Sequence, residues 1–104
     1  MFPQNKLKNM NIGHFQRLMK EIYFHRDSKR GKEKTMLWLV EEVGELAKAI
    51  RKDNREEMEE EFADVLAWLA SLANIVNIDL QKAVLKYYPN VCKYCKNNPC
   101  TCKK

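Results

Sequence analysis

Two clusters of carboxylates lie near the middle of the sequence, and their spacing suits a metal site. The clusters are Glu41-Glu42-x-x-Glu45 and Glu61-x-x-Asp64. Residues three apart in a helix project from one face, so each cluster supplies a pair of neighbouring carboxylates. Two such helices, paired antiparallel, would place four carboxylates around one point. Their repulsion would raise their pKa values, and Mg²⁺ or Mn²⁺ would relieve it because both ions prefer oxygen ligands.

The simplest alternative is that these acids lie on two solvated helix faces, since runs of surface acids are common. The register of the acids favours the metal site. Each carboxylate pair adjoins an apolar stripe, and each has a tryptophan about one turn away, Trp38 or Trp68. Carboxylates beside a core cost free energy unless they are paired or bound to metal.

The acids belong to the motifs E-E-x-G-E-L and E-x-x-D-V-L. These resemble the signature of MazG-type nucleotide pyrophosphohydrolases, in the all-α NTP pyrophosphatase superfamily, and the likeness covers roughly residues 8 to 88. The resemblance implies four ligands for Mg²⁺ or Mn²⁺: Glu42, Glu45, Glu61 and Asp64. It also implies that Glu41 binds the metal or orients a water. The implied reaction is attack of water on the α-phosphorus of a ribo- or deoxyribonucleoside triphosphate, giving monophosphate and pyrophosphate, in nucleotide-pool housekeeping.

Basic and aromatic residues near the acids are candidates for contacts with such a substrate. Residues 26–34, RDSKRGKEK, are expected to form a solvated interhelical loop from which one or two basic side chains reach the triphosphate. The phosphate-binding candidates are Arg30, Lys34 and, in the last helix, Lys86, although that helix is shorter than in many relatives. Trp38 and Trp68 are base-stacking candidates, because an aromatic face accepts any base. Phe15 is a further candidate, because the resemblance implies a base pocket built partly from the first helix. Packing in the core or at a subunit interface suits both tryptophans equally well.

Hydrophobic periodicity predicts an all-α chain of four helices, with the central pair antiparallel. The first is capped by Asn11 and ends near residues 25–28, and the second covers about 33–52. The third runs from a cap at Asn54 to about 74–76. The fourth begins at a cap, Asp79, and is stopped by Pro89. The apolar stripes of the central helices are expected to be buried. They comprise Met36, Leu39, Val40, Val43, Leu46, Ala47, Ile50, Met58, Phe62, Val65, Leu66, Leu69, Leu72 and Ala73.

The length of 104 residues predicts one small domain, residues 1–88, with a short tail, residues 89–104. A domain of this size is marginal alone, so we expect its subunits to associate. The family resemblance implies a homodimer or homotetramer, in which a basic residue from a neighbour could complete the site. Gly44 costs roughly 1 kcal/mol inside a helix, which indicates close approach of another backbone or of a ligand.

Composition places the chain among globular proteins, with 45% hydrophobic and 32% charged residues. No apolar run is long enough to span a membrane and no secretory signal is visible, so we expect no membrane partner and a cytoplasmic location. The net charge of +5 combines an acidic middle with basic flanks. Metal carboxylates beside basic residues suit a polyphosphate ligand.

The tail contains four cysteines in eleven residues: Cys92, Cys95, Cys100 and Cys102. Without a signal peptide, this spacing favours a structural tetrahedral Zn²⁺ site that would fold a segment too short for a core. Free thiols are one alternative, and disulfides are another if the source is a hyperthermophile. Nucleic acid is a further candidate ligand for such a knuckle, but it is not favoured.

Two rival functions follow from the same residues. A di-iron carboxylate bundle normally uses Glu-x-x-His motifs, and neither histidine lies near the acids. The other rival is a helical protein without enzymatic activity whose zinc-knuckle tail and basic segments bind nucleic acid or a protein partner. The helical pattern turns the carboxylates inward, towards the core, and this argues against a protein without enzymatic activity.

Overall fold

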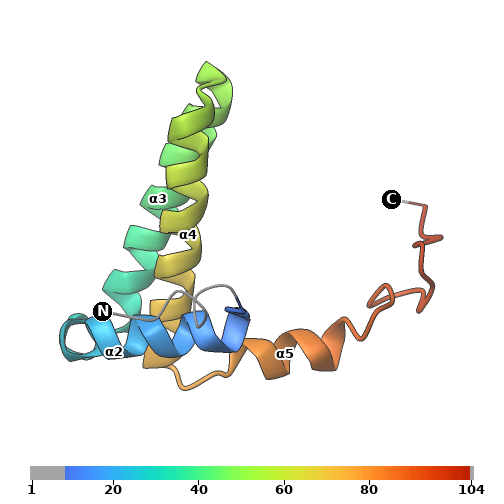
Figure 1. Cartoon of the computed structure of the whole chain (residues 1–104), viewed down its shortest axis with the longest axis horizontal. Coiled ribbons are helices and arrows are strands. Elements are labelled where there is room, and N and C mark those ends of the chain that lie inside the picture. The colour runs from blue at the N-terminus through green and yellow to red at the C-terminus, as the bar shows by residue number, and fades with distance from the viewer. Residues whose placement is uncertain (1–8, 104) are drawn as a thin grey trace.

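A computed structural model describes residues 9–103, which form four helices and no strand. The all-α prediction is therefore confirmed. Figure 1 shows an upright hairpin of two long helices, a third helix across its base, and a short fourth helix that leads away to the tail. The helices are α2 (Ile12–Arg30), α3 (Lys32–Lys52), α4 (Arg55–Ile75) and α5 (Leu80–Tyr87). In residues 9–103, no single helix is long and apolar enough to cross a membrane; α4 and α5 pass that test only as a pair bent by 98°.

The hairpin of α3 and α4 turns at the predicted break. Asp53 ends α3 in the left-handed region, with φ 57°, and its backbone N–H donates to the last turn of that helix. Asn54 begins α4, and its side chain accepts a hydrogen bond from the backbone N–H of Glu57 at 3.1 Å. This N-cap and the antiparallel pairing of the two central helices are both confirmed (Figure 1).

The connection between α2 and α3 differs from the prediction of a solvated loop over residues 26–34. Helix α2 continues to Arg30, and only Gly31 interrupts the chain before α3 starts at Lys32. Asp27 is buried and forms an ion pair with Arg30 one turn later, at 2.7 Å, which supports the last turn of α2. Gly31 has φ 86°, a value that glycine adopts at no steric cost. The chain therefore turns sharply, and the basic residues are held on helices.

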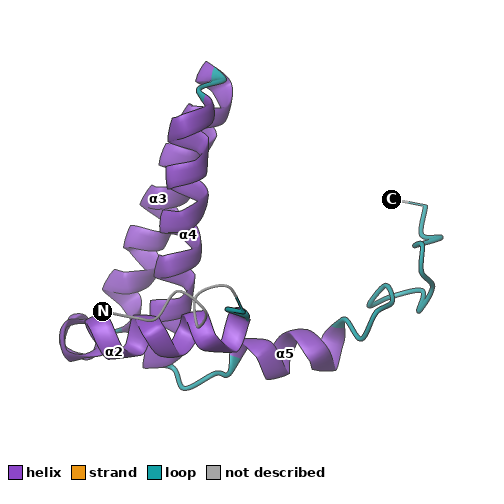
Figure 2. Ribbon diagram, in the orientation of Figure 1, coloured by secondary structure: helices purple, strands orange, loops and turns teal. Residues whose placement is uncertain are grey.

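Gln16 attaches the start of α5 to α2. Its buried amide donates to the side chain of Asn74 at 3.0 Å and to the carbonyl of Ile78 at 2.7 Å. Its carbonyl oxygen accepts from the backbone N–H of Leu80 at 2.8 Å. The predicted cap of α5 is also present, because Asp79 accepts from the N–H of Lys82. Beyond α5, residues 88–103 form loops and turns without regular secondary structure (Figure 2).

The predicted burial of the central apolar stripes is wrong for much of their length. Leu39 and Ala73 are buried, but Met36, Val40, Val43, Ile50, Phe62, Leu66 and Leu69 are exposed. The accessible surface is 8468 Å², whereas a compact monomer of 12.3 kDa would have about 6,100 Å². The radius of gyration of 15.9 Å likewise exceeds the roughly 13 Å of a compact domain of this length. A hairpin resting on one crossing helix does not have enough partner surface to cover both apolar stripes.

Candidate metal centre and adjoining cavity

Antiparallel pairing brings carboxylates from both acidic clusters together. One oxygen from each of Glu42, Glu61 and Asp64 lies within 4.8 Å of the other two, and all three residues are half-buried. Opposite ligands of Mg²⁺ are about 4.2 Å apart at the usual metal–oxygen distance, so small side-chain movements would let these oxygens share one ion. An oxygen-only donor set fits a hard cation rather than zinc or copper.

The environment of Glu61 favours its protonated form. Burial raises the pKa of its carboxyl group, and the nearby charges of Asp64 and Glu42 raise it further, with a smaller contribution from Glu45. Its Oε2 atom is buried and has no hydrogen-bond partner among the described residues. A buried carboxylate oxygen without a donor is costly unless a cation or a proton occupies that place.

The other two predicted acids lie outside this group of three. Glu45 is exposed, although it is close enough for its charge to act on Glu61. Glu41 is exposed and is not part of the cluster. Of the five predicted catalytic residues, the structure therefore brings three into direct proximity, with Glu45 beside them.

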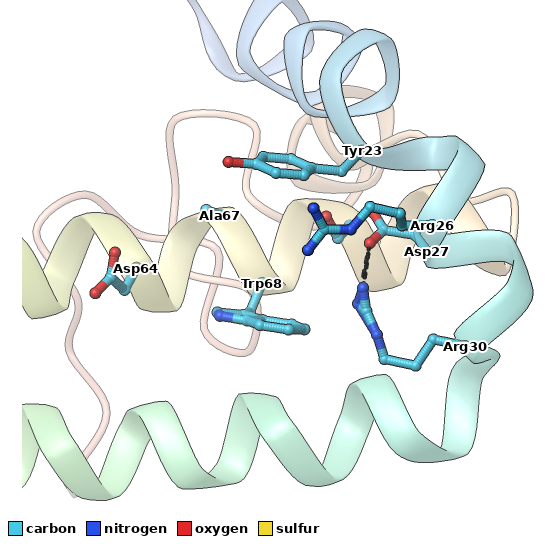
Figure 3. Close-up of a pocket in the computed structure, with 8 residues that line it drawn as sticks. Tyr23, Arg26, Asp27, Arg30, Asp64, Ala67 and Trp68 are labelled. Carbon is cyan, nitrogen blue, oxygen red and sulfur yellow. Dashed lines mark hydrogen bonds and ion pairs between the residues drawn. The ribbon is translucent and has the colours of Figure 1, made fainter.

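A cavity of about 270 Å³ adjoins the acidic cluster at Asp64 (Figure 3). Helices α2 and α4 form it, so acidic, basic and aromatic side chains face one space. Its lining residues are Tyr23, Arg26, Asp27, Arg30, Asp64, Ala67, Trp68 and Ser71. The cavity thus combines an acidic end suited to a metal with two guanidinium groups suited to phosphate and an aromatic wall.

Arg30 is held firmly at this cavity. Both of its terminal nitrogens donate to Oδ1 of Asp27, at 3.1 and 2.7 Å. Its guanidinium carbon lies 5.4 Å from the ring centroid of Trp38 and 4.8 Å from that of Trp68, within the range of cation–π attraction. The two tryptophan rings meet edge to face, with centroids 5.4 Å apart. Trp68 lines the cavity, while Trp38 packs behind it and is partly exposed.

Three of the predicted substrate contacts lie away from this cavity. Lys34 is exposed on α3 and is not among the lining residues. Phe15 lines a different, apolar cavity with Leu66 and Leu80. Lys86 is on α5, where its ammonium group lies 5.2 Å from the ring of Tyr87. None of these three residues lines the cavity beside the acidic cluster.

Four residues that line the cavity were not predicted from the sequence: Tyr23, Asp27, Ala67 and Ser71. Asp27 lies within residues 26–34, which were expected to form a loop. The sequence did carry one signal, since Asp27 and Arg30 are three apart and of opposite charge, as in an intrahelical ion pair. Ala67 and Ser71 are small residues one turn apart on α4, a pattern too common to be diagnostic.

The four cysteines of the tail form a second cluster. Their sulfur atoms all lie within 4.8 Å of one another, and all four thiols are free. Hydrogen bonds from the backbone N–H groups of Thr101 and Asn97 lower the pKa of Cys95 to about 5. Hydrogen bonding with the neighbouring cysteines, Cys100 foremost, raises the pKa of Cys102 to about 11. Four sulfurs gathered in this way are a candidate metal site.

Comparison with known families agrees with this geometry. Residues 30–95 match the MazG nucleotide pyrophosphohydrolase domain, and this match covers more than half of the chain. The protein therefore belongs to the MazG nucleotide pyrophosphohydrolase family. A comparison with curated proteins found no match.

The raised pKa of Glu61 predicts how stability depends on pH and metal. The folded protein binds a proton at Glu61 more tightly than the unfolded chain does. In the metal-free protein, this group therefore lowers stability as the pH rises from the ordinary glutamate pKa, about 4.3, through the raised value. Glu61→Gln should remove this pH-dependent loss. Mg²⁺ at 100 times its Kd should add about 2.7 kcal/mol to the wild type and much less to the variant.

Thermal unfolding at pH 5 and pH 7.5, with EDTA or with Mg²⁺, measures both effects. Glu59→Gln, an exposed acid on the same helix, is the control and should behave as the wild type. Equal Mg²⁺ stabilisation of the wild type and of Glu61→Gln would contradict the assignment of Glu61 as a ligand.

Proposed function

We propose that the protein is a Mg²⁺-dependent pyrophosphohydrolase that converts ribo- or deoxyribonucleoside triphosphates into monophosphate and pyrophosphate. The observation that carries this proposal is the group of three carboxylates with an orphaned, buried oxygen on Glu61, next to a cavity with two arginines. Family membership supports the same reaction class. Mn²⁺ has the same ligand preference and is an alternative ion.

Each side of the cavity has a distinct role in this proposal. Glu42, Glu61 and Asp64 would hold the metal, with Glu45 beside them. When bound, Mg²⁺ would neutralise phosphate charge and lower the pKa of a water for attack on the α-phosphorus. Arg26 is the more available phosphate donor, because both terminal nitrogens of Arg30 already bond Asp27. Trp68 offers its ring to a base.

The reaction forms a bond between the water oxygen and the α-phosphorus and breaks the bond to the oxygen that bridges to the β-phosphorus. The leaving group is pyrophosphate, and the proton from water passes to a base. Burial and neighbouring negative charge raise the proton affinity of Glu61 when the metal is absent. Metal binding would keep this group ionised, which excludes it as a proton donor in the loaded site.

Pyrophosphate release from a panel of ribo- and deoxyribonucleoside triphosphates tests this function. Mg²⁺ should support release of monophosphate and pyrophosphate, while EDTA, Glu45→Gln and Glu61→Gln should each lower kcat/KM by about 100-fold or more. Glu59→Gln should retain activity. No turnover of any nucleotide by folded, metal-loaded protein would overturn the proposal and favour a protein that only binds nucleic acid or a partner.

We propose that the cysteine cluster holds one structural Zn²⁺. The sulfurs of Cys92 and Cys102 are 3.8 Å apart, and those of Cys95 and Cys100 are 3.9 Å apart. A tetrahedral ion with Zn–S bonds near 2.3 Å requires sulfurs about 3.8 Å apart. A disulfide would need about 2.05 Å. Backbone N–H groups of Thr101 and Cys102 donate to the sulfurs of Cys95 and Cys100, as expected of thiolate ligands.

Elemental analysis of the purified protein should find one zinc ion per chain. Cys95→Ser should lose it, while the far-ultraviolet circular dichroism of the four helices should change little. Thr101→Val, which keeps the backbone donor, is the control and should retain zinc. Stoichiometric zinc in Cys95→Ser, or none in wild-type protein prepared under reducing conditions, would contradict this site.

We infer that a second copy of this chain covers the exposed stripes of α3 and α4, giving a homodimer or homotetramer. The excess of about 2,400 Å² over a compact monomer exceeds the area of a standard subunit interface. Gly44 lies on the exposed side of α3, and a methyl group there would meet nothing within 4 Å among the described residues. Glycine destabilises a helix, so its presence here indicates that another backbone approaches α3 closely at Gly44. That backbone would belong to a neighbouring subunit.

Light scattering should give a mass that is a multiple of 12.3 kDa. Phe62→Lys places a charge on the exposed stripe and should shift the mass towards the monomer, because burying an unpaired ammonium is costly. Ala63→Lys, a quarter turn away on α4, adds the same charge as a control and should leave the assembly intact. A monomeric wild-type protein at micromolar concentration would contradict the interface.

A further inference from the structure

We propose that the C-terminal part of this protein is a binding site for single-stranded nucleic acid, separate from the acidic cluster. The site comprises the end of α5 and the cysteine-rich tail. It rests on the metal-bound tail proposed above, but not on the hydrolytic activity.

The first observation is charge. Residues 80–103 contain five lysines and no aspartate or glutamate. Four thiolates around one Zn²⁺ would subtract two charges, so the segment would still carry about three positive charges. Within residues 9–103, the ion pairs are Arg30–Asp27 and Lys52–Glu57, so no lysine of this segment is neutralised by an acid. A cationic segment without acids is an electrostatic footprint for a polyanion.

The second observation is that aromatic rings alternate with these lysines. Lys93 lies between two tyrosines, with its ammonium 5.1 Å from the ring of Tyr87 and 5.5 Å from that of Tyr94. The ammonium group of Lys86 also lies near Tyr87, 5.2 Å from its ring centroid. Tyr94 is 77% exposed, and Tyr88 is more than half exposed. Exposed rings within a cationic strip are what stacking on successive bases requires, while the lysines contact the phosphates between them.

The third observation is a shallow hollow of about 350 Å³ beside the cysteines. Tyr88, Asn97 and Asn98 are among the residues that line it. The amide nitrogens of Asn97 and Asn98 already donate to Oγ1 of Thr101 and to the carbonyl of Asn90. Their side-chain oxygens can accept hydrogen bonds from the amino groups of unpaired bases. A ring for stacking next to amides for edge contacts favours nucleic acid over a purely anionic surface such as a membrane.

These features also favour a single strand over a duplex. Bases in a duplex already stack on one another and would not reach exposed tyrosines, whereas bases in a single strand can be splayed onto them. Single-stranded RNA and single-stranded DNA both offer unstacked bases and phosphates, so the experiment below tests both.

Fluorescence anisotropy with the full, zinc-loaded chain tests the proposal. The probes are labelled 12-nucleotide single strands of RNA and of DNA, the matching duplex, and vesicles of phosphatidylcholine with phosphatidylserine. The single strands should bind more tightly than the duplex. Tyr94→Ala should weaken binding about tenfold, and Tyr94→Phe should restore it.

Salt dependence separates the tail from the rest of the surface. Replacing Lys93, Lys96 and Lys103 together by glutamine should lower the slope of log K against log salt by about 2. Replacing Lys20, Lys48 and Lys52, which lie on α2 and α3, removes the same charge and should leave the slope unchanged. Glu61→Gln should bind as the wild type does, which keeps this site distinct from the hydrolytic one.

The proposal is overturned if no single strand binds, if the duplex binds as tightly, or if vesicles bind and oligonucleotides do not. An equal loss in both triple-lysine variants would also overturn it, because binding would then reflect net charge alone. Zinc content is measured on the same samples. Protein that holds zinc but binds no single strand would refute this site alone, whereas purified protein that holds no zinc would refute the zinc site on which it rests.

Discussion

Repulsion among carboxylates is the constraint on which the rest of this structure depends. The register of α3 against α4 holds Glu42, Glu61 and Asp64 together, although each would separate from the others in water. Burial and the two neighbouring charges raise the pKa of Glu61, and one of its oxygens is buried without a donor. The packing of Trp38 against Trp68, one turn away, helps to maintain this register. Such an arrangement favours binding of a cation, because a cation relieves the repulsion among the carboxylates. This agrees with membership of the MazG nucleotide pyrophosphohydrolase family.

Helix α2 turns that arrangement from an acidic patch into a candidate active site. It crosses the base of the hairpin and contributes Tyr23, Arg26 and the Asp27–Arg30 pair to the cavity next to Asp64 (Figure 3). The sharp turn at Gly31 matters here, because a flexible loop would leave the guanidinium groups without a fixed position. Planar guanidinium groups on a helix are better placed to meet phosphate than lysines on a loop. The same crossing leaves the outer stripes of α3 and α4 uncovered, which links the shape of the site to the expected assembly.

Local patterns predicted most of the fold, and tertiary contacts account for what they missed. The caps at Asn11, Asn54 and Asp79 were readable because each bonds a backbone N–H three residues later in the sequence. The spacing of the acids predicted that Glu42, Glu61 and Asp64 would lie together, because helix periodicity and antiparallel pairing suffice to place them. The end of α2 was missed because a buried ion pair overrode the polar composition of residues 26–30. Phe62 and Leu66 were expected inside because periodicity identifies an apolar face but not whether the same chain covers it.

Binding of Mn²⁺ to the wild type, Glu61→Gln and Glu59→Gln, followed by electron paramagnetic resonance, tests directly whether these carboxylates form a metal centre. We expect tight binding by the wild type and by Glu59→Gln at pH 7.5. Glu61→Gln should bind at least tenfold more weakly, within the range that loss of one ligand or its partner usually costs. Equal Mn²⁺ affinity in all three proteins would contradict the claim that the carboxylates gathered between α3 and α4 form the metal centre.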